Sequence, residues 1–340
     1  MNHPRRSEPP AVSVVMCTYN GARYLREQLE SIAGQSRLPA ELIVCDDGSD
    51  DETVPILRTF ASDVQFPVRI SRNPDRLGST RNFDQAIGLA SGELIALCDQ
   101  DDVWTPEKLE RLSDILIANA SLGGVFSDAA LIDDNGRSIG STLFEKHRFS
   151  SRKQREFLDN PAKVLLKHDV VTGATLMFRR AMLPFVRPIP PSWVHDAWLA
   201  WIISLHSNLA LTTAPFTFYR IHDGQQFGIG SARPKQDARR HYRRVAHQFE
   251  DLADHLLHSG WTDKDDIIHR IRAKVAFLQK ESVLSTSLLI RVLQMIGLFP
   301  LYRHYARGLG ALRTDLFLGR ETSCTNRCSV LVRCLPHPLR

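Results

Sequence analysis

The sequence contains no stretch of 18 apolar residues that is free of charge, so it predicts no membrane-spanning helix. It also contains no internal repeat and no low-complexity segment. Its last three cysteines, Cys324, Cys328 and Cys334, lack the Cys-x-x-Cys spacing of a structural zinc site. The chain has 340 residues, of which 43% are hydrophobic and 24% are charged. This composition is typical of an ordinary folded protein.

The first ten residues, Met1–Pro10, are polar and rich in proline and have no apolar core. They do not resemble a secretory signal, and we expect a disordered leader. Cys17, Cys45 and Cys98 lie in or at the ends of apolar runs, as buried thiols do. Together these observations predict a protein of the reducing cytoplasm.

Positive charge is concentrated in the last third of the chain. Segment 231–340 has 19 Lys and Arg against 10 Asp and Glu, whereas segment 1–230 has 24 against 28. A basic segment is typical of contact with nucleic acid or with the anionic face of a membrane. Few aromatic residues stand among these arginines, and the acidic first part would repel a phosphate backbone, so nucleic acid is disfavoured.

The basic segment predicts a helical extension over 231–318, followed by a disordered tail over 319–340. Helical periodicity is clearest at 235–253 and 265–282. The mostly apolar stretch 288–299 is too short and too charged to cross a bilayer. It fits a helix lying in the membrane interface, and packing against the rest of the protein is the alternative.

Strand and helix patterns alternate along the first hundred residues. Each short apolar run is followed by a helical pattern with charges between its apolar positions. The predicted strands are 12–17, 42–45, 68–70 and 93–98, and the predicted helices are 22–33, about 50–61 and 81–90. This alternation is typical of an α/β domain with a parallel sheet and helices on both of its faces.

Three of these strands end in polar residues, namely Thr18-Tyr19, Asp46-Asp47 and Asp99-Gln-Asp101. Because successive parallel strands place their carboxyl ends at one edge of the sheet, we expect these groups to converge on one ligand. A tyrosine can stack on a base, and carboxylates can bind a base N–H, a ribose hydroxyl or a metal. For Asp46-Asp47 a helix-capping turn is the alternative, since Asp-Gly-Ser is favourable turn chemistry.

The fourth strand carries the strongest signal, because its apolar run stops at three carboxylates, Asp99, Asp101 and Asp102. Oxygen ligands in an Asp-x-Asp arrangement suit a hard cation, whose remaining positions suit a diphosphate. An acidic turn before the helix that begins near Thr105 is the alternative. A dinucleotide-binding Rossmann domain is disfavoured, because the turn after the first strand lacks Gly-x-Gly-x-x-Gly.

Three blocks of the sequence resemble the signature blocks of family 2 glycosyltransferases, in the same order and with similar spacing. The blocks are Val12-Ser-Val-Val-Met-Cys-Thr-Tyr-Asn-Gly21, Cys45-Asp-Asp-Gly-Ser-Asp-Asp-Glu-Thr53 and Asp99-Gln-Asp-Asp-Val-Trp-Thr-Pro106. The resemblance covers about residues 11–225. It implies an inverting, nucleotide-sugar-dependent enzyme with a GT-A domain over 11–230, in which a mostly parallel sheet flanked by helices includes a Rossmann-like nucleotide-binding half.

The resemblance also implies roles for the strand ends. Tyr19 and Asp47 would contact the nucleobase beside Thr18, and Arg81 would approach the diphosphate or the base. Asp99 would contact the ribose, and Asp101 would bind Mg²⁺ or Mn²⁺ that bridges the diphosphate.

The middle of the chain is expected to bind the sugars. We predict a mobile loop over 145–160 and a strand over 170–178. This strand resembles the family's strand before the acceptor region, and the resemblance implies that Gly173 lets a sugar approach closely; a core strand with a bulge at this glycine is the alternative. The resemblance adds Asp102, Trp104 and His195 to this sugar-binding set.

The resemblance implies that Asp196 is the catalytic base, and an ordinary acidic residue in the first helical turn is the alternative. His195 stands where the family commonly has Glu, and the His-Asp pair resembles the rhamnosyltransferase-like branch. Further on, the segment Tyr219-Arg-Ile-His222 resembles a family segment whose histidine lies near the metal and the diphosphate. This resemblance makes His222 a candidate metal or phosphate ligand and Arg220 a candidate charge partner. A purely structural role for His222 is an equally good alternative.

These predictions define a metal-dependent hexosyl- or deoxyhexosyltransferase that uses a dTDP- or UDP-linked sugar and a lipid-linked or oligosaccharide acceptor. The expected process is surface polysaccharide or glycolipid synthesis, in the cytoplasm or peripherally on the inner face of the plasma membrane. A non-catalytic nucleotide-sugar-binding relative is the alternative, although intact Asp99, Asp101 and Asp196 argue against it.

Overall fold

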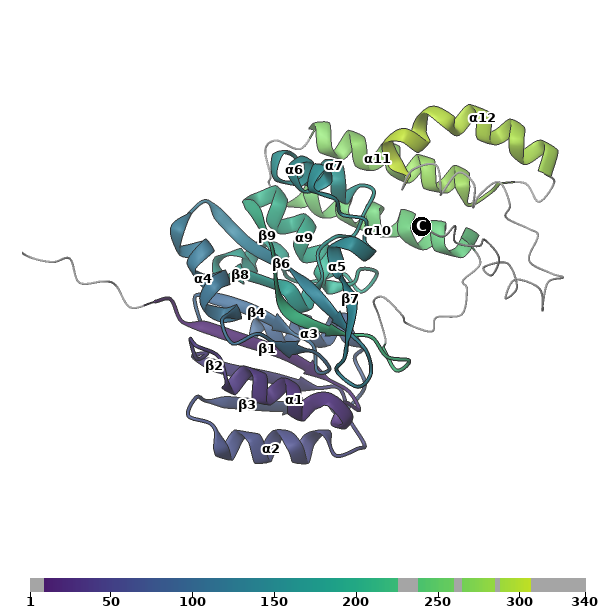
Figure 1. Cartoon of the computed structure of the whole chain (residues 1–340). Helices are drawn as coiled ribbons and strands as arrows, with labels where there is room; N and C mark the ends of the chain where they lie inside the picture. Colours follow the sequence, from purple (N-terminus) through teal and green to yellow (C-terminus); the bar gives the residue numbers. More distant parts are fainter. Residues whose placement is uncertain (1–8, 226–237, 260–264, 285–287, 307–340) are drawn as a thin grey trace, which may run out of the picture.

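The computed structural model describes residues 9–225, 238–259, 265–284 and 288–306 (Figure 1). The predictions of a disordered tail at 319–340 and, but for its last two residues, of a disordered leader lie outside the described residues.

The first half of the chain forms the predicted alternation of strands and helices. Four parallel strands pair in the spatial order β3-β2-β1-β4, because each strand is connected to the next by a helix. The strands are β1 (Val12–Thr18), β2 (Glu41–Asp46), β3 (Val68–Arg72) and β4 (Leu94–Cys98), and the helices are α1 (Ala22–Ala33), α2 (Thr53–Asp63) and α3 (Ser79–Gly88). The α/β fold class is therefore confirmed.

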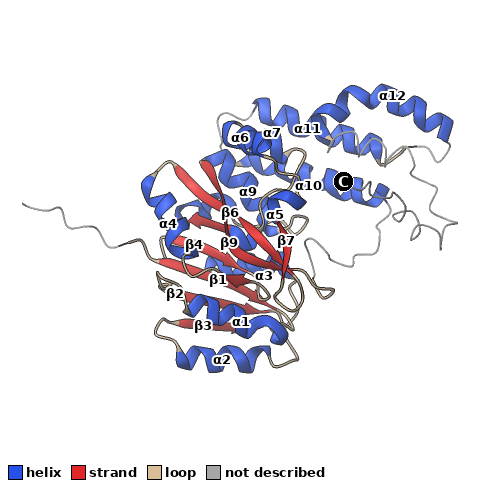
Figure 2. Cartoon of the chain, viewed as in Figure 1, coloured by secondary structure: helices blue, strands red, loops and turns tan. Residues whose placement is uncertain are grey.

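Beyond β4 the sheet becomes mixed rather than parallel (Figure 2). β8 lies antiparallel to both β4 and β6, β9 runs parallel to β6, and β5 and β7 pair antiparallel to β9 and β6. The strands are β5 (Val103–Trp104), β6 (Leu122–Ile132), β7 (Ser138–Thr142), β8 (Leu176–Arg179) and β9 (Asn208–Arg220). The parallel part of the sheet thus covers its first four strands, and these strands build the edge on which the predicted site depends.

Alternating side chains of the central strands fill two separate cores. On β1, Val14 packs on the face covered by α1, α2 and α4 (Lys108–Ala118), and Val15 packs on the opposite face. That second face is covered by α3, α9 (His195–His206) and the C-terminal helices. Both valines are fully buried, and each such side chain stabilises the fold by about 1.5–3 kcal/mol.

The predicted loop over 145–160 is wrong, because this segment is mostly helical. It contains α5 (Leu143–Lys146) and α6 (Ser151–Asp159), and α7 (Pro161–Leu165) follows. Thr142 and Glu145 form a reciprocal capping box at the start of α5, and Phe157 anchors α6 in an aromatic cluster with Phe126. The predicted strand over 170–178 is also shorter than expected, since Gly173–Thr175 form a 3₁₀ turn before β8.

In the described residues after β9, three helices pack beyond α9, at the end of the molecule opposite α2 (Figure 1). The three helices are α10 (Ala238–His258), α11 (Asp265–Glu281) and α12 (Leu288–Tyr305). Earlier in the chain, the short elements η2 (Arg180–Met182) and α8 (Leu183–Val186) precede α9. The helical C-terminal part is thus confirmed. Among the helices described, none is both long enough and apolar enough to cross a membrane.

Candidate active site

A cavity of about 1310 Å³ opens at the carboxyl edge of the parallel strands. The polar residues that follow β1, β2 and β4 all contribute to its wall, and the start of α9 and the turn after β9 close it from the other side. Of the residues singled out in the sequence, the lining contains Thr18, Tyr19, Asp47, Asp99, Asp101, His195, Asp196 and His222. Thr18, Asp47 and Asp99 therefore converge as the parallel topology predicts, while α9 and the turn after β9 bring in residues up to 204 positions away in the chain.

Asp47 anchors the loop that follows β3. Its carboxylate accepts hydrogen bonds from the backbone N–H groups of Leu77 and Gly78, at 2.7 and 2.8 Å, and from the Asn73 side chain at 3.0 Å. Gly78 has a φ of 80°, a conformation that favours glycine. Asp47 therefore holds this loop against the cavity, whereas Asp46 makes the contacts of a turn and accepts the backbone N–H of Ser49 at 2.9 Å.

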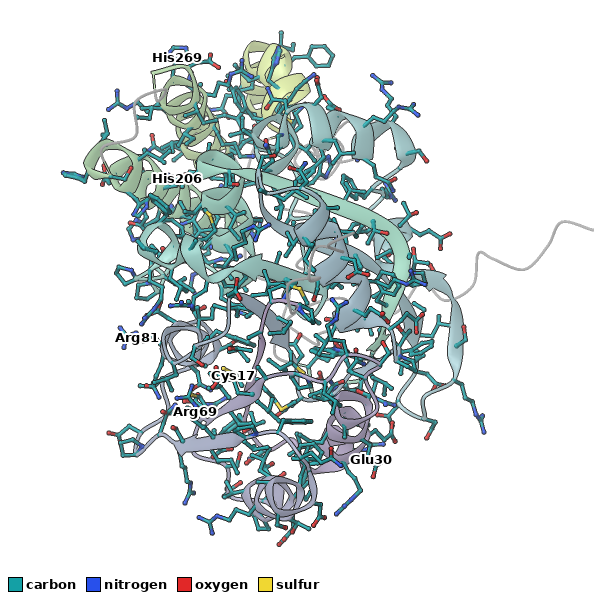
Figure 3. All side chains as sticks on the ribbon, turned by 90° about the vertical axis from the view of Figure 1, so that its left-hand side faces the viewer. Cys17, Glu30, Arg69, Arg81, His206 and His269 are labelled. Atoms are coloured by element: carbon teal, nitrogen blue, oxygen red, sulfur yellow. The ribbon has the colours of Figure 1, made fainter. Side chains whose placement is uncertain are left out.

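Arg76 lies on the same loop and was missed in the sequence. Its guanidinium carbon is 3.7 Å from the centroid of the Tyr19 ring, and its Nε is 4.0 Å from the carboxylate of Asp47. Arg81, the arginine that was singled out instead, is exposed in the first turn of α3 and does not line the cavity. Figure 3 shows Arg81 at the edge of the molecule. The signal for Arg76 was its position in a polar loop after a parallel strand.

Adjacent carboxylates at the end of β4 point in different directions. Asp101 lies in the cavity wall, where its Oδ2 is 2.9 Å from Nε2 of His222. Asp102 is fully buried, and its Oδ1 accepts the backbone N–H of Arg220 at 3.0 Å. Trp104 is also buried, with its ring 3.8 Å from the ammonium of Lys108. The prediction that Asp102 and Trp104 bind sugar therefore needs correction, because both side chains pack in the interior outside the cavity.

The carboxylate cluster has the electrostatics of a cation site. Burial, and then the charge of Asp101, raise the pKa of Asp99 to about 7. Such repulsion is relieved when a cation binds between the carboxylates. No group of three or more His, Cys, Asp or Glu side chains is placed to hold a metal within the part of the chain that the structure describes. Asp99 and Asp101 offer carboxylate oxygens, the kind of ligand that a hard cation binds.

His222 orients Asp101 in this arrangement. Its Nδ1 accepts the backbone N–H of Gly224 at 3.2 Å, and its Nε2 faces Asp101. Both ring nitrogens of His222 are therefore engaged by the protein, one at Gly224 and the other at Asp101.

Asp196 occupies the first turn of α9 and faces the same cavity. Its two carboxylate oxygens accept the backbone N–H groups of Gly173, at 3.1 Å, and Ala197, at 2.7 Å. Burial raises the pKa of Asp196 to about 6, and the charge of Asp169 adds to this rise while the two hydrogen bonds oppose it. A carboxylate with this pKa can accept a proton near neutral pH.

His195 stacks on Phe83 of α3, with 3.9 Å between ring centroids. Burial lowers the pKa of His195 to about 3, so the ring is neutral. Gly173 packs against this ring: a Cβ on residue 173 would lie 2.8 Å from Nε2 of His195, so only glycine fits. Gly173 does not line the cavity, which corrects its prediction as a sugar-approach point, because its open side faces the imidazole.

A mixed α/β sheet with a carboxylate-lined cavity at its parallel edge defines the GT-A class of glycosyltransferase. The sequence profile described as glycosyl transferase family 2 matches residues 13–183. The chain belongs to that family, and the recognition of its three blocks in the sequence is confirmed.

Relatives and solved structures agree with this assignment. An uncharacterised glycosyltransferase of Haemophilus influenzae is 34% identical over 237 residues, covering 68% of this chain and 72% of the relative. An uncharacterised glycosyltransferase of Nostoc sp. is 29% identical over 250 residues, which cover 67% of this chain and 70% of the relative.

Two crystal structures share the fold. TarS residues 1–349 of S. aureus, solved with UDP-GlcNAc, has a TM-score of 0.54 at 18% identity and covers 91% of this chain and 89% of its own. The mannosyltransferase PcManGT of Pyrobaculum calidifontis was solved with GDP-Man and Mn²⁺. It has a TM-score of 0.53 at 19% identity, and the match covers 92% of this chain and 86% of the mannosyltransferase.

Proposed function

We propose that this glycosyltransferase moves a sugar from a nucleoside-diphosphate sugar to an acceptor hydroxyl with inversion at the anomeric carbon. The observation that carries the proposal is the position of Asp99, Asp101 and Asp196 around one cavity. Asp99 and Asp101 follow β4, where the ribose and the diphosphate with its cation are proposed to lie, and Asp196, whose pKa is raised, lines the same cavity from the first turn of α9. A non-catalytic relative has no need of such a base, so this geometry favours turnover.

The proposed reaction is a single displacement. Asp196 accepts the proton of the acceptor hydroxyl as general base, and that oxygen forms a bond to the anomeric carbon. The bond from that carbon to the diphosphate oxygen breaks on the opposite face, which inverts the configuration. Mg²⁺ or Mn²⁺, held at Asp101 beside His222, would supply positive charge for the leaving diphosphate. No enzyme nucleophile is required.

Tyr19, Asp47 and Arg76 would hold the nucleotide, with Thr18 beside them. The ring of Tyr19 and the guanidinium of Arg76 are already stacked, so a base can extend an existing stack. The structures of similar fold were solved with UDP-GlcNAc and with GDP-Man and Mn²⁺, which supports a nucleotide-sugar donor. The sequence prediction of a dTDP- or UDP-linked donor stays a proposal, as does rhamnose, which rests on the His195–Asp196 pair alone.

The acceptor is proposed to be lipid-linked or oligosaccharide, in polysaccharide synthesis at the inner face of the plasma membrane. Ile296 and Phe299 on α12 are 65% and 56% exposed, and Arg240, Arg243 and Arg244 are exposed on α10. Apolar side chains on α12 and cationic side chains on α10 suit peripheral contact with anionic lipid. Sedimentation with anionic vesicles should fall for a Phe299→Ser variant, and equal sedimentation of both proteins would count against this contact.

A thermal-shift panel tests the donor site. Purified protein is heated with UDP, dTDP, GDP or CMP, each with and without Mn²⁺, beside Asp101→Asn and a control, Asp63→Asn, at the end of α2. One nucleotide at a hundredfold excess over its dissociation constant should stabilise wild type and the control by about 2.7 kcal/mol only with Mn²⁺. Asp101→Asn should lose this response. The absence of any shift in the wild type, with any nucleotide, would reject the proposal.

A further inference from the structure

The turn that leads into α9 is fastened to α10 by three hydrogen bonds. Nε1 of Trp193 donates to the backbone carbonyl of Gln248 at 2.8 Å, and Nε2 of Gln248 donates back to the carbonyl of Ser192 at 2.7 Å. The Ser192 hydroxyl donates to the carboxylate of Asp251, one helical turn further along α10. Trp193 and Gln248 are both buried, so these bonds are shielded from water.

Aromatic packing fixes the same contact. The Trp193 ring lies edge-on to Phe249 of α10 and to Trp198 of α9, with 5.7 Å between centroids in each pair. Trp201 also meets Phe249 edge-on at 5.8 Å. Each such pair adds about 0.5–1.5 kcal/mol beyond the burial of its area. The start of α9 is therefore locked to α10 by geometry as well as by apolar contact.

The opposite side of this turn is held by α3, which helps to line the cavity. Thr80 Oγ1 donates to the backbone carbonyl of Trp193 at 2.7 Å. One turn along α3, Phe83 stacks on His195. Trp193 thus lies between α3 and α10, and Asp196 follows it by three residues. Any displacement of the turn would move the proposed base against the cavity.

We infer that Gln248 is a positioning residue, which sets the Asp196 carboxylate through the Ser192–Trp193 turn and makes α10 a required part of the active site. The inference rests on the proposed role of Asp196 as base. It extends the site to α10, which lies, like Asp196 itself, beyond residues 13–183, the segment matched by the family profile. Gln248 itself lies outside the cavity lining and acts through the turn.

Two roles for α10 make different predictions. If α10 only covers apolar surface, loss of the Gln248 side-chain bond lowers the melting temperature and leaves kcat unchanged. If Gln248 positions the base, kcat falls while the KM for the nucleotide sugar stays, because the donor contacts lie on other elements. A loosened turn also admits water to Asp196, which moves the rising limb of the kcat–pH profile to lower pH. The charges that face Asp196 across the cavity, Asp99 and Asp169, are unchanged in these variants.

The experiment compares the full-length wild type with Gln248→Ala, Trp193→Phe and a control, Gln279→Ala. Trp193→Phe removes the Nε1 donor to the Gln248 carbonyl and part of the indole packing, keeps an aromatic ring, and leaves the Gln248 side-chain bond to Ser192 in place. Gln279 is the same residue type in the same helical part, but it donates to Glu250 instead of the turn. All are assayed below their melting temperatures for nucleotide release in the presence of acceptor, across pH 5 to 8.

The expected result is a kcat that falls about 10- to 100-fold in both turn variants, the scale of a small misplacement of a catalytic group. KM should stay within about twofold, and Gln279→Ala should behave as wild type. Wild-type kcat and pH profile in Gln248→Ala, or in Trp193→Phe where Gln248→Ala does not fold, would overturn the inference. Absence of transfer in the wild type would instead overturn the proposed function, and this inference with it.

Discussion

The guanidinium of Arg220 lies directly behind Asp101. Its Nε donates to the backbone carbonyl of Asp101 at 2.8 Å, and its Nη2 donates to the carboxylate of Glu27 on α1 at 2.6 Å. The side chain is 1% exposed and also stacks over Tyr24, 4.7 Å from the ring centroid. A buried cation therefore ties the end of β9 and α1 to the turn that carries the proposed metal-binding carboxylate.

Replacement of Arg220 by Lys should destabilise the protein and weaken the cation site together. Lys keeps the charge but cannot donate to both Asp101 and Glu27 in the fixed geometry of a guanidinium. We expect the free energy of unfolding to fall by about 2 kcal/mol, the scale of a lost hydrogen bond to a charged group, in urea denaturation. The Mn²⁺-dependent stabilisation by nucleotide should fall as well.

Arg23→Lys is the matched control for Arg220→Lys. Arg23 pairs with Asp134 at the surface and is 65% exposed, so its replacement should cost less than about 1 kcal/mol. An equal decrease in the free energy of unfolding for the two variants would show that the buried contacts of Arg220 contribute no more stability than a surface ion pair.

Sequence reasoning identified the strand ends correctly because topology brings them together. Thr18, Asp47 and Asp99 follow parallel strands, and the edge they share is fixed once the strand-helix alternation is recognised. Asp102 and Trp104 were misplaced because a motif gives residue types and not directions. Asp101 faces the cavity, whereas the next carboxylate turns into the interior, and only packing decides this.

Contacts between distant segments were beyond the reach of the sequence. The partners of Arg220 lie 193 and 119 residues away in the chain, and no local pattern names them. Gln248 gave no signal either, since a polar residue in a basic amphipathic helix reads as solvent-exposed. By contrast, the capping box of Thr142 and Glu145 is a local pattern, Thr-x-x-Glu, that the sequence itself displays at the start of α5.

His195 should make the protein less stable in acid. Its pKa is about 3 in the folded protein and 6.5 in the unfolded chain, because burial disfavours the charged ring. Between these values the unfolded chain binds a proton that the folded protein does not. The contribution is therefore fully present above pH 6.5 and is lost as pH falls, by about 1.4 kcal/mol per pH unit.

Urea denaturation at pH 7, 6 and 5 measures this dependence. His195→Gln should show a shallower loss of stability than the wild type over the same range. His269→Gln, at an exposed position on α11, serves as control and should follow the wild type. Parallel curves for all three proteins would remove His195 as a source of acid sensitivity.

Arg76 and Arg81 make competing predictions for the nucleotide site. Arg76→Ala removes the cation stacked on Tyr19 and should raise the KM for the nucleotide sugar about 3- to 10-fold, the scale of a partly exposed cation–π contact. The kcat should change little, because the contact is made before and during the reaction alike. Arg81→Ala should match the wild type in both constants. A larger effect for Arg81→Ala would restore the role predicted for Arg81 in the sequence.

The protonation of Asp196 should determine the acidic limb of the kcat–pH profile. Only its deprotonated form accepts the acceptor proton, and burial raises its pKa to about 6, so kcat should fall as pH drops through about 6 and not near 4. Asp196→Asn should lower kcat by about 10²- to 10⁴-fold at pH 7.5 while the nucleotide still stabilises the protein with Mn²⁺.

Asp169→Asn removes a neighbouring charge that raises the pKa of Asp196, so the acidic limb of the kcat–pH profile should move to lower pH. Nucleotide release measured from pH 5 to 8 distinguishes these cases, with Asp63→Asn as the control. A limb near pH 4 in the wild type, or an Asp196→Asn enzyme with undiminished kcat, would assign the base to another group on the cavity wall.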